Sequence, residues 1–394
     1  MPPVDESRDS PWPRLRQSFT MRGCDYRTEV QRRARAYAQN PRAFTASWRR
    51  AMPFLLLVVD ELRKRDLPGE FAMLPYLESG YRPLATHGDR PAGMWQLVPD
   101  TAREAGVEID ADYDGRLDAL ASTSAALDLI ARYYREFADW RLADMAFNSG
   151  EFRVRKLLGE RDARSLSADE LGRFAFNPVT HDHLDRLLAL ACIIDDPARF
   201  GIHLPEPHAD DHLQEIVLET SMDLRLAARL AGVGVGDVKT WNAGYRHDRM
   251  AGTAVHRLLL PAAQVERFRA GADAVPRTLW RDWHEQPAAR TSGIGSWAAQ
   301  SGVPVAVLAL ANALDENATV MSSTRLLLPG REPQPNDAPH ASSATSARSH
   351  TIAAGNAPSG VAHRHSVPLR RLRKLDPVAS APQHPVAKLR VGTD

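Results

Sequence analysis

The sequence has few of the features that mark the simplest functional classes. Its two cysteines, Cys24 and Cys192, lie far apart in unlike contexts, so we expect free thiols instead of a disulfide framework or a metal site. Fifty Lys and Arg residues nearly cancel 49 Asp and Glu residues, and the formal net charge of +1 gives no global field for nucleic acid. The longest apolar run, residues 52–59, is far shorter than the roughly 20 residues that cross a bilayer. A soluble globular protein of several domains remains.

The first residues also lack the order of an export signal. Residues 1–14 are polar and rich in proline, without the basic and then apolar segments of a secretory signal. Cys24 ends a TMRGC segment that faintly suggests lipoprotein acylation, but no apolar stretch precedes it. We therefore expect neither a visible signal peptide nor a transmembrane segment.

Two patterns of secondary structure divide the chain. From about residue 26 to residue 192, apolar residues recur at a spacing of three to four, which predicts helices throughout. After residue 205 a pattern of strand, helix, helix and strand begins and then repeats. The two copies at 213–262 and 278–330 both close on an LLLP segment.

The tail is expected to hold a linker and a third copy of the repeat. The linker is rich in Pro, Ser, Ala and His, a composition typical of disorder. The expected order is an N-terminal helical extension, a helical domain, two repeats, the linker and a last repeat, at residues 1–45, 46–200, 210–270, 277–330, 331–348 and 349–392.

Glu78 is the strongest candidate for a chemical role. It lies at a helix end among apolar and aromatic neighbours, after a kink expected at Pro75, and partial desolvation there would keep a proton available for donation. An ordinary glycosidase needs a second carboxylate, and none is obvious beside Glu78. The chemistry is complete if the substrate supplies its own nucleophile, the 6-hydroxyl of N-acetylmuramic acid, with Glu78 acting first as acid and then as base.

Five motifs follow one another along the helical half. They are Glu78-Ser79, AGMWQ at 92–96, DGRLD at 114–118, the helix start STSAALDLI and AFNSGEFRV at 146–154. In this order they resemble the catalytic region of the soluble lytic transglycosylases, a family with a goose-lysozyme-like fold, over residues 11–200. The resemblance implies a multidomain protein, with an all-α lysozyme-like catalytic domain followed by small α+β (βααβ) LysM-like repeats.

The resemblance also implies roles for single residues. Glu78 would be the sole catalytic acid and base, and Ser79 would orient it by a hydrogen bond. Gly93 would admit the glycan, the Gln96 amide would contact substrate, and Asn148 would hydrogen-bond an N-acetyl group. The implied substrate-binding residues are Ser79, Gly93, Met94, Gln96, Phe147, Asn148 and His183. No metal and no cofactor is implied.

Three positions depart from the family pattern. Phe147 stands where the family has tyrosine in AYN, Phe152 replaces the second glycine of GEG, and His183 occupies the place of a tyrosine near the catalytic acid. His183 could replace that tyrosine as a hydrogen-bond partner of Glu78 or of the substrate. In the alternative interpretation, His181 and His183 both lie on an exposed helix start.

The repeats resemble the LysM domain, which binds N-acetylglucosamine polymers. Asn242, Asn312 and Asp376 after the second helix of each copy carry this resemblance, together with the closing LLLP strands. The Gly-Asp-Thr-Leu opening typical of LysM is absent, being weakened to AAGNAPS at 353–359. The repeats could therefore be glycan-binding modules or, alternatively, spacers or protein-docking units.

Two further motifs have simpler explanations. The segment DADYDG at 110–115 imitates a calcium loop, but position twelve is Ala121 instead of the bidentate glutamate. Asp114 and Asp118 are better explained as helix caps or salt-bridge partners. GVGVG at 232–236 fits the turn between two helices, because no strand precedes it.

The residues together predict a lytic transglycosylase that cleaves the bond between N-acetylmuramic acid and N-acetylglucosamine and leaves 1,6-anhydro ends. The alternative is a wall-binding or scaffolding protein with an inactive site, and a goose-type hydrolase shares the fold and the acid. The expected partner is the glycan strand of peptidoglycan, and we expect a monomer in the periplasm or cell envelope.

Overall fold

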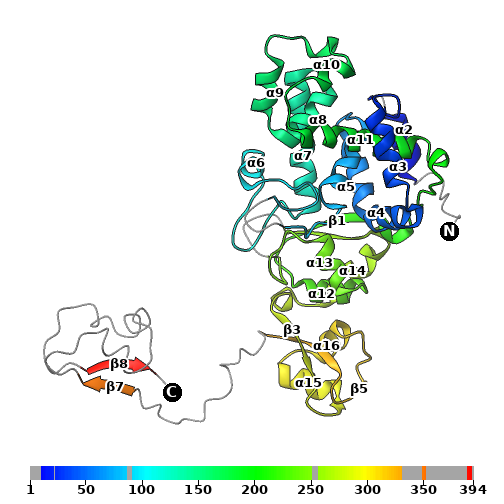
Figure 1. The fold of residues 1–394 in the computed structure, drawn as a ribbon. Coiled ribbons are helices and arrows are strands. Elements are labelled where there is room, and N and C mark those ends of the chain that lie inside the picture. Colours follow the sequence, from blue (N-terminus) through cyan, green and yellow to red (C-terminus); the bar gives the residue numbers. More distant parts are fainter. Residues whose placement is uncertain are drawn as a thin grey trace. The chain divides into compact units, whose positions relative to one another are not determined.

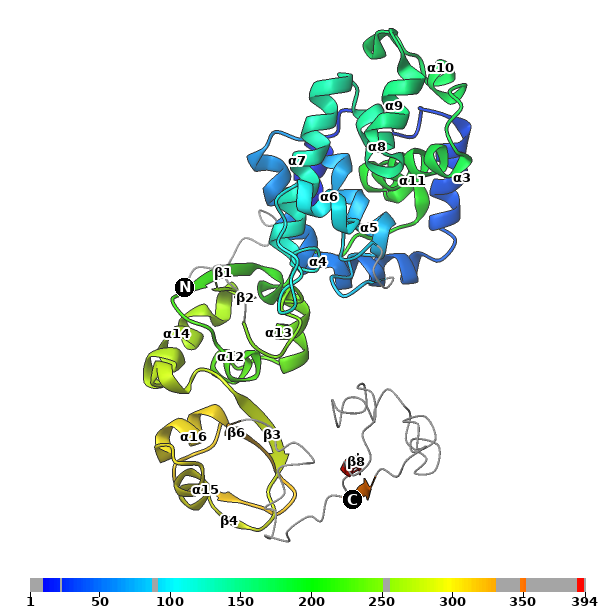
Figure 2. The same cartoon turned by 90° about the vertical axis from the view of Figure 1, so that its left-hand side faces the viewer.

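The computed structural model describes residues 10–21, 23–86, 91–250, 256–330, 348–351 and 388–392. The chain divides into two units, Met1–Glu332 and Pro333–Asp394. The first unit holds a helical domain and two successive strand-helix-helix-strand repeats (Figures 1 and 2). The predicted fold class, an all-α domain followed by small α+β repeats, is therefore confirmed.

Ten α-helices and short 3-10 turns occur among the described residues of the helical domain before the first repeat. The one that carries most of the core is α4, whose Phe44, Trp48, Met52 and Leu55 are buried. The full set is α2 (Pro11–Gln17), α3 (Thr28–Tyr37), α4 (Pro41–Lys64), α5 (Leu74–Ser79), α6 (Pro99–Glu104), α7 (Ala119–Phe137), α8 (Trp140–Ser149), α9 (Glu151–Leu158), α10 (Ala168–Gly172) and α11 (Pro178–Asp195).

The helix that carries Glu78 is shorter than the sequence predicts. A single helix kinked at Pro75 was expected, but a 3-10 turn, η1 (Gly69–Met73), gives way to the six-residue α5. Pro75 is thus at the start of a new helix, where its missing N–H removes no hydrogen bond. Gly80, with φ of 65°, ends α5 at once, so Glu78 lies in its last turn.

Aromatic packing fixes α5 on the core. The rings of Trp48 in α4 and Tyr76 in α5 stack with centroids 4.4 Å apart and an interplanar angle of 9°. The Tyr76 hydroxyl lies 2.7 Å from the Ser47 hydroxyl. Since α5 has fewer than two turns, these contacts from α4 are what hold it in place.

Cys24 and Cys192 form a disulfide, so the expectation of free thiols is wrong. Their Cα atoms are 5.0 Å apart across a sequence separation of 168 residues. Cys24 precedes α3 and Cys192 lies in α11, and these two helices pack against each other. The sequence does not indicate that these two cysteines are close in space, because their pairing depends on tertiary structure.

The two predicted repeats share one hydrophobic core and the same strand pairing. In each repeat the opening strand pairs antiparallel with the closing strand around two helices. The first repeat has β1 (Leu213–Leu218), α12 (Leu224–Ala231), α13 (Val235–Trp241) and β2 (His256–Pro261), followed by α14 (Val265–Ala274). The second has β3 (Trp283–Pro287), β4 (Ser292–Gly293), α15 (Ile294–Ser301), α16 (Val305–Ala311), β5 (Thr319–Val320) and β6 (Arg325–Pro329).

An asparagine makes the same clamp in both repeats. Asn242 donates from Nδ2 to the carbonyl of Leu259, 3.0 Å away, and its Oδ1 accepts the N–H of Leu259 at 2.7 Å. Asn312 makes the equivalent pair with Leu327, at 2.9 and 2.7 Å. Each amide thereby ties the end of the second helix to the closing strand. Asn242 and Asn312, two of the residues that carry the LysM resemblance, therefore maintain the fold of their repeats.

The third repeat stays a prediction, because the structure describes only its two expected outer strands. Strands β7 (Arg348–Thr351) and β8 (Lys388–Gly392) pair antiparallel. Asp376, the helices predicted between these strands and residues 331–347 of the predicted linker lie outside the described residues, and the last linker residue, Arg348, begins β7. Among the residues that are described, no single helix is long and apolar enough to span a membrane, and α15 and α16 pass that test only as a pair bent by 108°.

The first repeat is docked on the helical domain through the segment that imitates a calcium loop. Asp114 donates its backbone N–H to the carbonyl of Gly244 at 2.8 Å, and its buried carboxylate pairs with Arg116 at 2.8 Å and Arg246 at 3.0 Å. Asp118 caps α7. The prediction that Asp114 and Asp118 serve as salt-bridge partner and cap is confirmed.

The disulfide makes the stability of this domain dependent on redox state. Cross-linking across 168 residues removes conformational entropy from the unfolded chain, and we expect its loss to cost roughly 2–4 kcal/mol. Dithiothreitol should therefore lower the melting temperature of the wild type, measured by circular dichroism. The Cys24→Ser/Cys192→Ser protein should melt lower and ignore the reductant, whereas an equal response of both proteins would contradict the cross-link.

Candidate active site

Three helices bring three ionisable side chains together in the helical domain. Glu78 comes from the last turn of α5, Asp144 from the middle of α8 and His183 from the second turn of α11. Nε2 of His183 lies 3.0 Å from Oε1 of Glu78. Nδ1 of the same ring lies 3.2 Å from the carboxylate of Asp144 and bonds to Oδ2. One imidazole thus bridges two carboxylates.

These three side chains differ in their access to solvent. The side chain of Glu78 is 20% exposed, that of His183 is 7% exposed and that of Asp144 is fully buried. The exposed fraction of the side chain therefore decreases from Glu78 through His183 to Asp144. These three residues are called the row below. Of the two carboxylates, Glu78 is the one that a substrate can reach.

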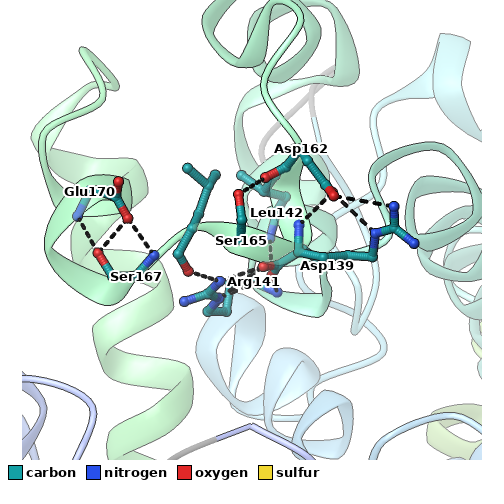
Figure 3. Close-up of polar contacts among 9 residues, drawn as sticks. Asp139, Arg141, Leu142, Asp162, Ser165, Ser167 and Glu170 are labelled. Carbon is teal, nitrogen blue, oxygen red and sulfur yellow. Dashed lines mark hydrogen bonds and ion pairs between the residues drawn. The ribbon is translucent and has the colours of Figure 1, made fainter.

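The start of α8 is built by hydrogen bonds that set the position of Asp144. Asp139 caps the helix, accepting the backbone N–H of Arg141 at 2.7 Å and of Leu142 at 3.4 Å. Arg141 pairs with Asp139 and donates to the carbonyl of Leu166 at 2.8 Å, which ties α8 to the segment before α10 (Figure 3). With the helix phase fixed, Asp144 falls on the buried face.

The electrostatics of the row centre on the imidazole. Burial lowers the pKa of His183, but the carboxylates of Asp144 and Glu78 outweigh burial and raise that pKa to about 10. The ring is therefore a cation over the working range of most enzymes. As a cation it donates from both nitrogens, to Asp144 through Nδ1 and to Glu78 through Nε2.

Glu78 uses one of its oxygens for this contact. Oε1 accepts from His183, while no described residue hydrogen-bonds Oε2. One oxygen of the carboxyl group is thus held by the protein and the other is left for a ligand. This arrangement suits a group that must give a proton to a bound molecule and take one back.

Gly93 and Met94 of the AGMWQ segment pack against the protein itself. Gly93 has φ of 81°, and a Cβ there would lie 1.7 Å from the carbonyl oxygen of Arg116. The glycine therefore admits the backbone of the DGRLD segment, and its admission of glycan stays a prediction. Met94 is fully buried, so its side chain belongs to the core and not to a substrate surface.

Ser79 and Gln96 also hold the local backbone. The Ser79 hydroxyl bonds to the carbonyl of Met94 at 3.0 Å and accepts the N–H of Arg82, so the predicted bond to Glu78 is absent from its contacts. Neighbouring side chains on a helix point about 100° apart, which directs Ser79 away from its neighbour. Gln96 donates from Nε2 to the carbonyl of Gly93 at 2.9 Å and closes its own turn.

Asn148 and Phe147 lie at the end of α8. Asn148 is half-buried, and its amide has no hydrogen-bond partner among the described residues, so it is available for a ligand. Phe147 is half-buried and packs edge-on against Trp95, with ring centroids 6.2 Å apart. Trp95 is itself held by a 2.9 Å hydrogen bond to Thr123.

The two histidines of α11 have unlike environments. His181 lies 3.0 Å from the carbonyl of Phe174 and packs edge-on against Phe176. His183 is buried against Glu78 and Asp144. The interpretation that places both on an exposed helix start is therefore wrong, and the one that pairs His183 with Glu78 agrees with the geometry.

Asp144 was missed by the sequence reasoning, although the sequence holds a signal for it. In α8 it is flanked by Leu142, Ala143, Met145 and Ala146, all of them buried. An acidic residue inside an apolar stretch is rarely buried without a partner. The partner comes from α11, 39 residues along the chain, which local pattern cannot reveal.

Comparison with known proteins gives two family matches. Residues 58–169 match the model described as Transglycosylase SLT domain. Residues 212–277, which hold the first repeat, match the model described as Lytic transglycosylase MltD, LysM-like domain. The first match contains Glu78 and Asp144, and His183 follows it in the chain.

Two named proteins are similar to this chain over part of their own length. Membrane-bound lytic murein transglycosylase D of Escherichia coli (strain K12) is 33% identical over 221 residues, 56% of this chain and 49% of that protein. A protein of Alteromonas sp. (strain M-1) named for tributyltin chloride resistance is 42% identical over 106 residues, 27% of this chain and 51% of its own. The chain thus spans about half the length of these relatives.

One solved structure has a weaker likeness. An inactive mutant of lytic transglycosylase Slt from Pseudomonas aeruginosa aligns with 36% of this chain and 24% of its own. The TM-score is 0.30 and the sequence identity is 22%. A likeness of this size supports no conclusion about the site.

The raised pKa of His183 makes a signed prediction about stability. A histidine whose pKa is about 10 in the folded chain and about 6.5 in the unfolded chain contributes stability that is complete below about pH 6.5 and is lost as pH rises through about 10. The difference in unfolding free energy between wild type and His183→Gln should therefore shrink from about pH 6 to about pH 10.5 in urea titrations.

His181→Gln is the matched control, because it removes a histidine from the same helix whose partner is a backbone carbonyl. A constant difference between wild type and His183→Gln across this pH range would contradict the ion pair.

Proposed function

We propose that this chain, which carries a transglycosylase SLT domain followed by a LysM-like domain of the MltD type, is a peptidoglycan lytic transglycosylase. In this proposal it cleaves the β-1,4 bond between N-acetylmuramic acid and N-acetylglucosamine and leaves 1,6-anhydro ends. The observation that carries the proposal is Glu78, one carboxyl group with one oxygen held by the protein and one open to a ligand.

The proposed reaction needs one group to serve twice. Glu78 gives a proton to the glycosidic oxygen as the bond to the anomeric carbon breaks. The 6-hydroxyl of the same N-acetylmuramic acid then attacks that carbon, and Glu78 takes up the hydroxyl proton. Because the nucleophile belongs to the substrate, its effective concentration is high and no water has to be positioned.

The burial of the second carboxylate supports this mechanism over two-carboxylate hydrolysis. Retaining and inverting glycosidases place both carboxyl groups beside the sugar. Asp144 is fully buried, and the imidazole of His183 lies between it and Glu78. It therefore cannot act on the sugar as a nucleophile or base.

Asn148 is the proposed contact to the sugar acetamido group. Its half-buried amide lies in the last turn of α8, the helix that carries Asp144, and is not engaged by any described residue. An amide that is desolvated on binding would favour sugars that offer an N-acetyl partner over sugars that lack one. Glycan specificity would thus reside at the end of α8.

The repeats are proposed to bind the glycan strands. The first is docked on the helical domain through Asp114 and Arg246, so strands held by the repeats would remain close to the SLT domain. The cell envelope is the proposed location, since peptidoglycan lies there and a disulfide persists in an oxidising compartment. The proposed active form is a monomer.

The proposed chemistry is tested by removing the acid alone. Glu78→Gln keeps the size of the side chain but cannot exchange the proton, so we expect anhydro products to fall below detection in mass spectra of digested peptidoglycan. Glu104→Gln, at an exposed position of α6, is the matched control and should retain wild-type product.

The spectrum of wild-type products separates the candidate functions. Anhydro ends support the proposal, reducing ends identify a hydrolase, and intact glycan identifies a binding protein. Undiminished cleavage by Glu78→Gln would remove Glu78 from the mechanism.

Glycan binding by the repeats is tested by co-sedimentation. Residues 205–394 alone, once shown to be folded by circular dichroism, should be retained on insoluble peptidoglycan and should not be retained on cellulose. The Glu78→Gln full chain should sediment as wild type does. Absence of retention for the folded fragment would identify the repeats as spacers or docking units.

A further inference from the structure

We propose that Asp144 is a positioning residue that acts through His183. Its buried carboxylate keeps the imidazole cationic, and the cation holds Oε1 of Glu78, so that Oε2 alone exchanges protons with the substrate. This inference rests on the proposed function and assigns a role to a residue that never touches the glycan.

The first step of the argument is the isolation of Asp144. Its side chain is fully buried in α8, and one of its oxygens, Oδ1, has no hydrogen-bond partner among the residues that the structure describes. A buried carboxylate without a counter-ion is strongly unfavourable. His183 is the cation that faces it, so the charge of Asp144 and the second proton of His183 stabilise each other.

The second step is the hydrogen-bonding capacity of the ring. A neutral imidazole carries one N–H and can donate to Asp144 or to Glu78, but not to both. A protonated ring donates from Nδ1 to Asp144 and from Nε2 to Glu78, which are the two contacts observed, at 3.2 and 3.0 Å. The cation can therefore make both contacts as a donor, with Glu78 accepting through Oε1.

The third step follows the protons through the proposed reaction. The proton on Oε2 of Glu78 moves to the leaving oxygen as the glycosidic bond breaks, and Glu78 becomes a carboxylate. The new charge forms next to the Nε2–H of His183, where it is stabilised. When the 6-hydroxyl attacks the anomeric carbon, its proton returns to Oε2. His183 keeps both of its protons throughout, and no proton is gained or lost overall.

Charged groups on the other elements that pack against α11 are engaged elsewhere. Arg27 and Arg33 pair with Asp185 and Asp182 of α11, Arg16 of α2 donates to the carbonyl of Ile194, and Glu70 of η1 accepts the backbone N–H groups of Thr20 and Met21. The groups that face the imidazole are therefore Asp144 from α8 and Glu78 from α5.

The test separates the charge of Asp144 from its shape. Asp144→Asn keeps a hydrogen-bond acceptor for Nδ1 but removes the negative charge, so burial should then favour the neutral ring. In the full chain, labelled at histidine and observed by NMR, His183 should remain protonated to about pH 10 in the wild type. In Asp144→Asn it should titrate more than one pH unit lower.

The pH dependence of turnover should follow the titration. With peptidoglycan as substrate, kcat of Asp144→Asn should fall by at least about tenfold at alkaline pH. It should recover toward the wild-type value at acid pH, where the ring is protonated without help, and KM should change little. Asp182→Asn is the matched control, because it removes a partly exposed aspartate of α11 that pairs with Arg33.

Each outcome bears on the proposal. A His183 titration that is the same in wild type and Asp144→Asn would overturn it, as would a loss of kcat by one factor at every pH. Should Asp144→Asn fail to fold, the wild-type titration decides, since a His183 that deprotonates below about pH 7 contradicts the role of Asp144. A wild type that makes no anhydro product defeats the proposed function, while the titration still judges the Asp144–His183 pair.

Discussion

A cation held between two carboxyl groups is the constraint on which the helical domain depends. The ring of His183 meets Glu78 and Asp144 from two sides, and each of the three groups would be costly to bury without the others. Three helices must therefore meet with correct height and rotation. The Asp139 cap fixes where α8 begins. The stack of Trp48 on Tyr76 holds α5 in position, and packing against α3 holds α11.

The parts of this structure that local pattern encodes were predictable from the sequence. Helical spacing and the recurring LLLP segments identified the two classes of domain, and the position of Glu78 at a helix end marked it as a candidate. The partner of Cys24, the role of Gly93 and the burial of Asp144 were not predictable. Each depends on a segment that is distant in sequence: Cys192, the Arg116 carbonyl and His183.

The same distinction explains the corrections in the AGMWQ segment. A motif shows which residue types occur together, but it does not say whether they face a ligand or each other. Gln96 bonds to the Gly93 carbonyl and Ser79 bonds to the Met94 carbonyl, so the motif maintains the shape of the loop beside α5. Contacts that build a site and contacts that bind a ligand have the same sequence signature.

The disulfide has a consequence for the order in which the molecule can be assembled. The ring closed by Cys24 and Cys192 encloses Glu78, Asp144 and His183, and every repeat lies beyond it. Both cysteines and the three residues of the row therefore precede the first strand of the repeats in the chain. They are synthesised before the repeats. The disulfide around these three residues can therefore close before the repeats have folded.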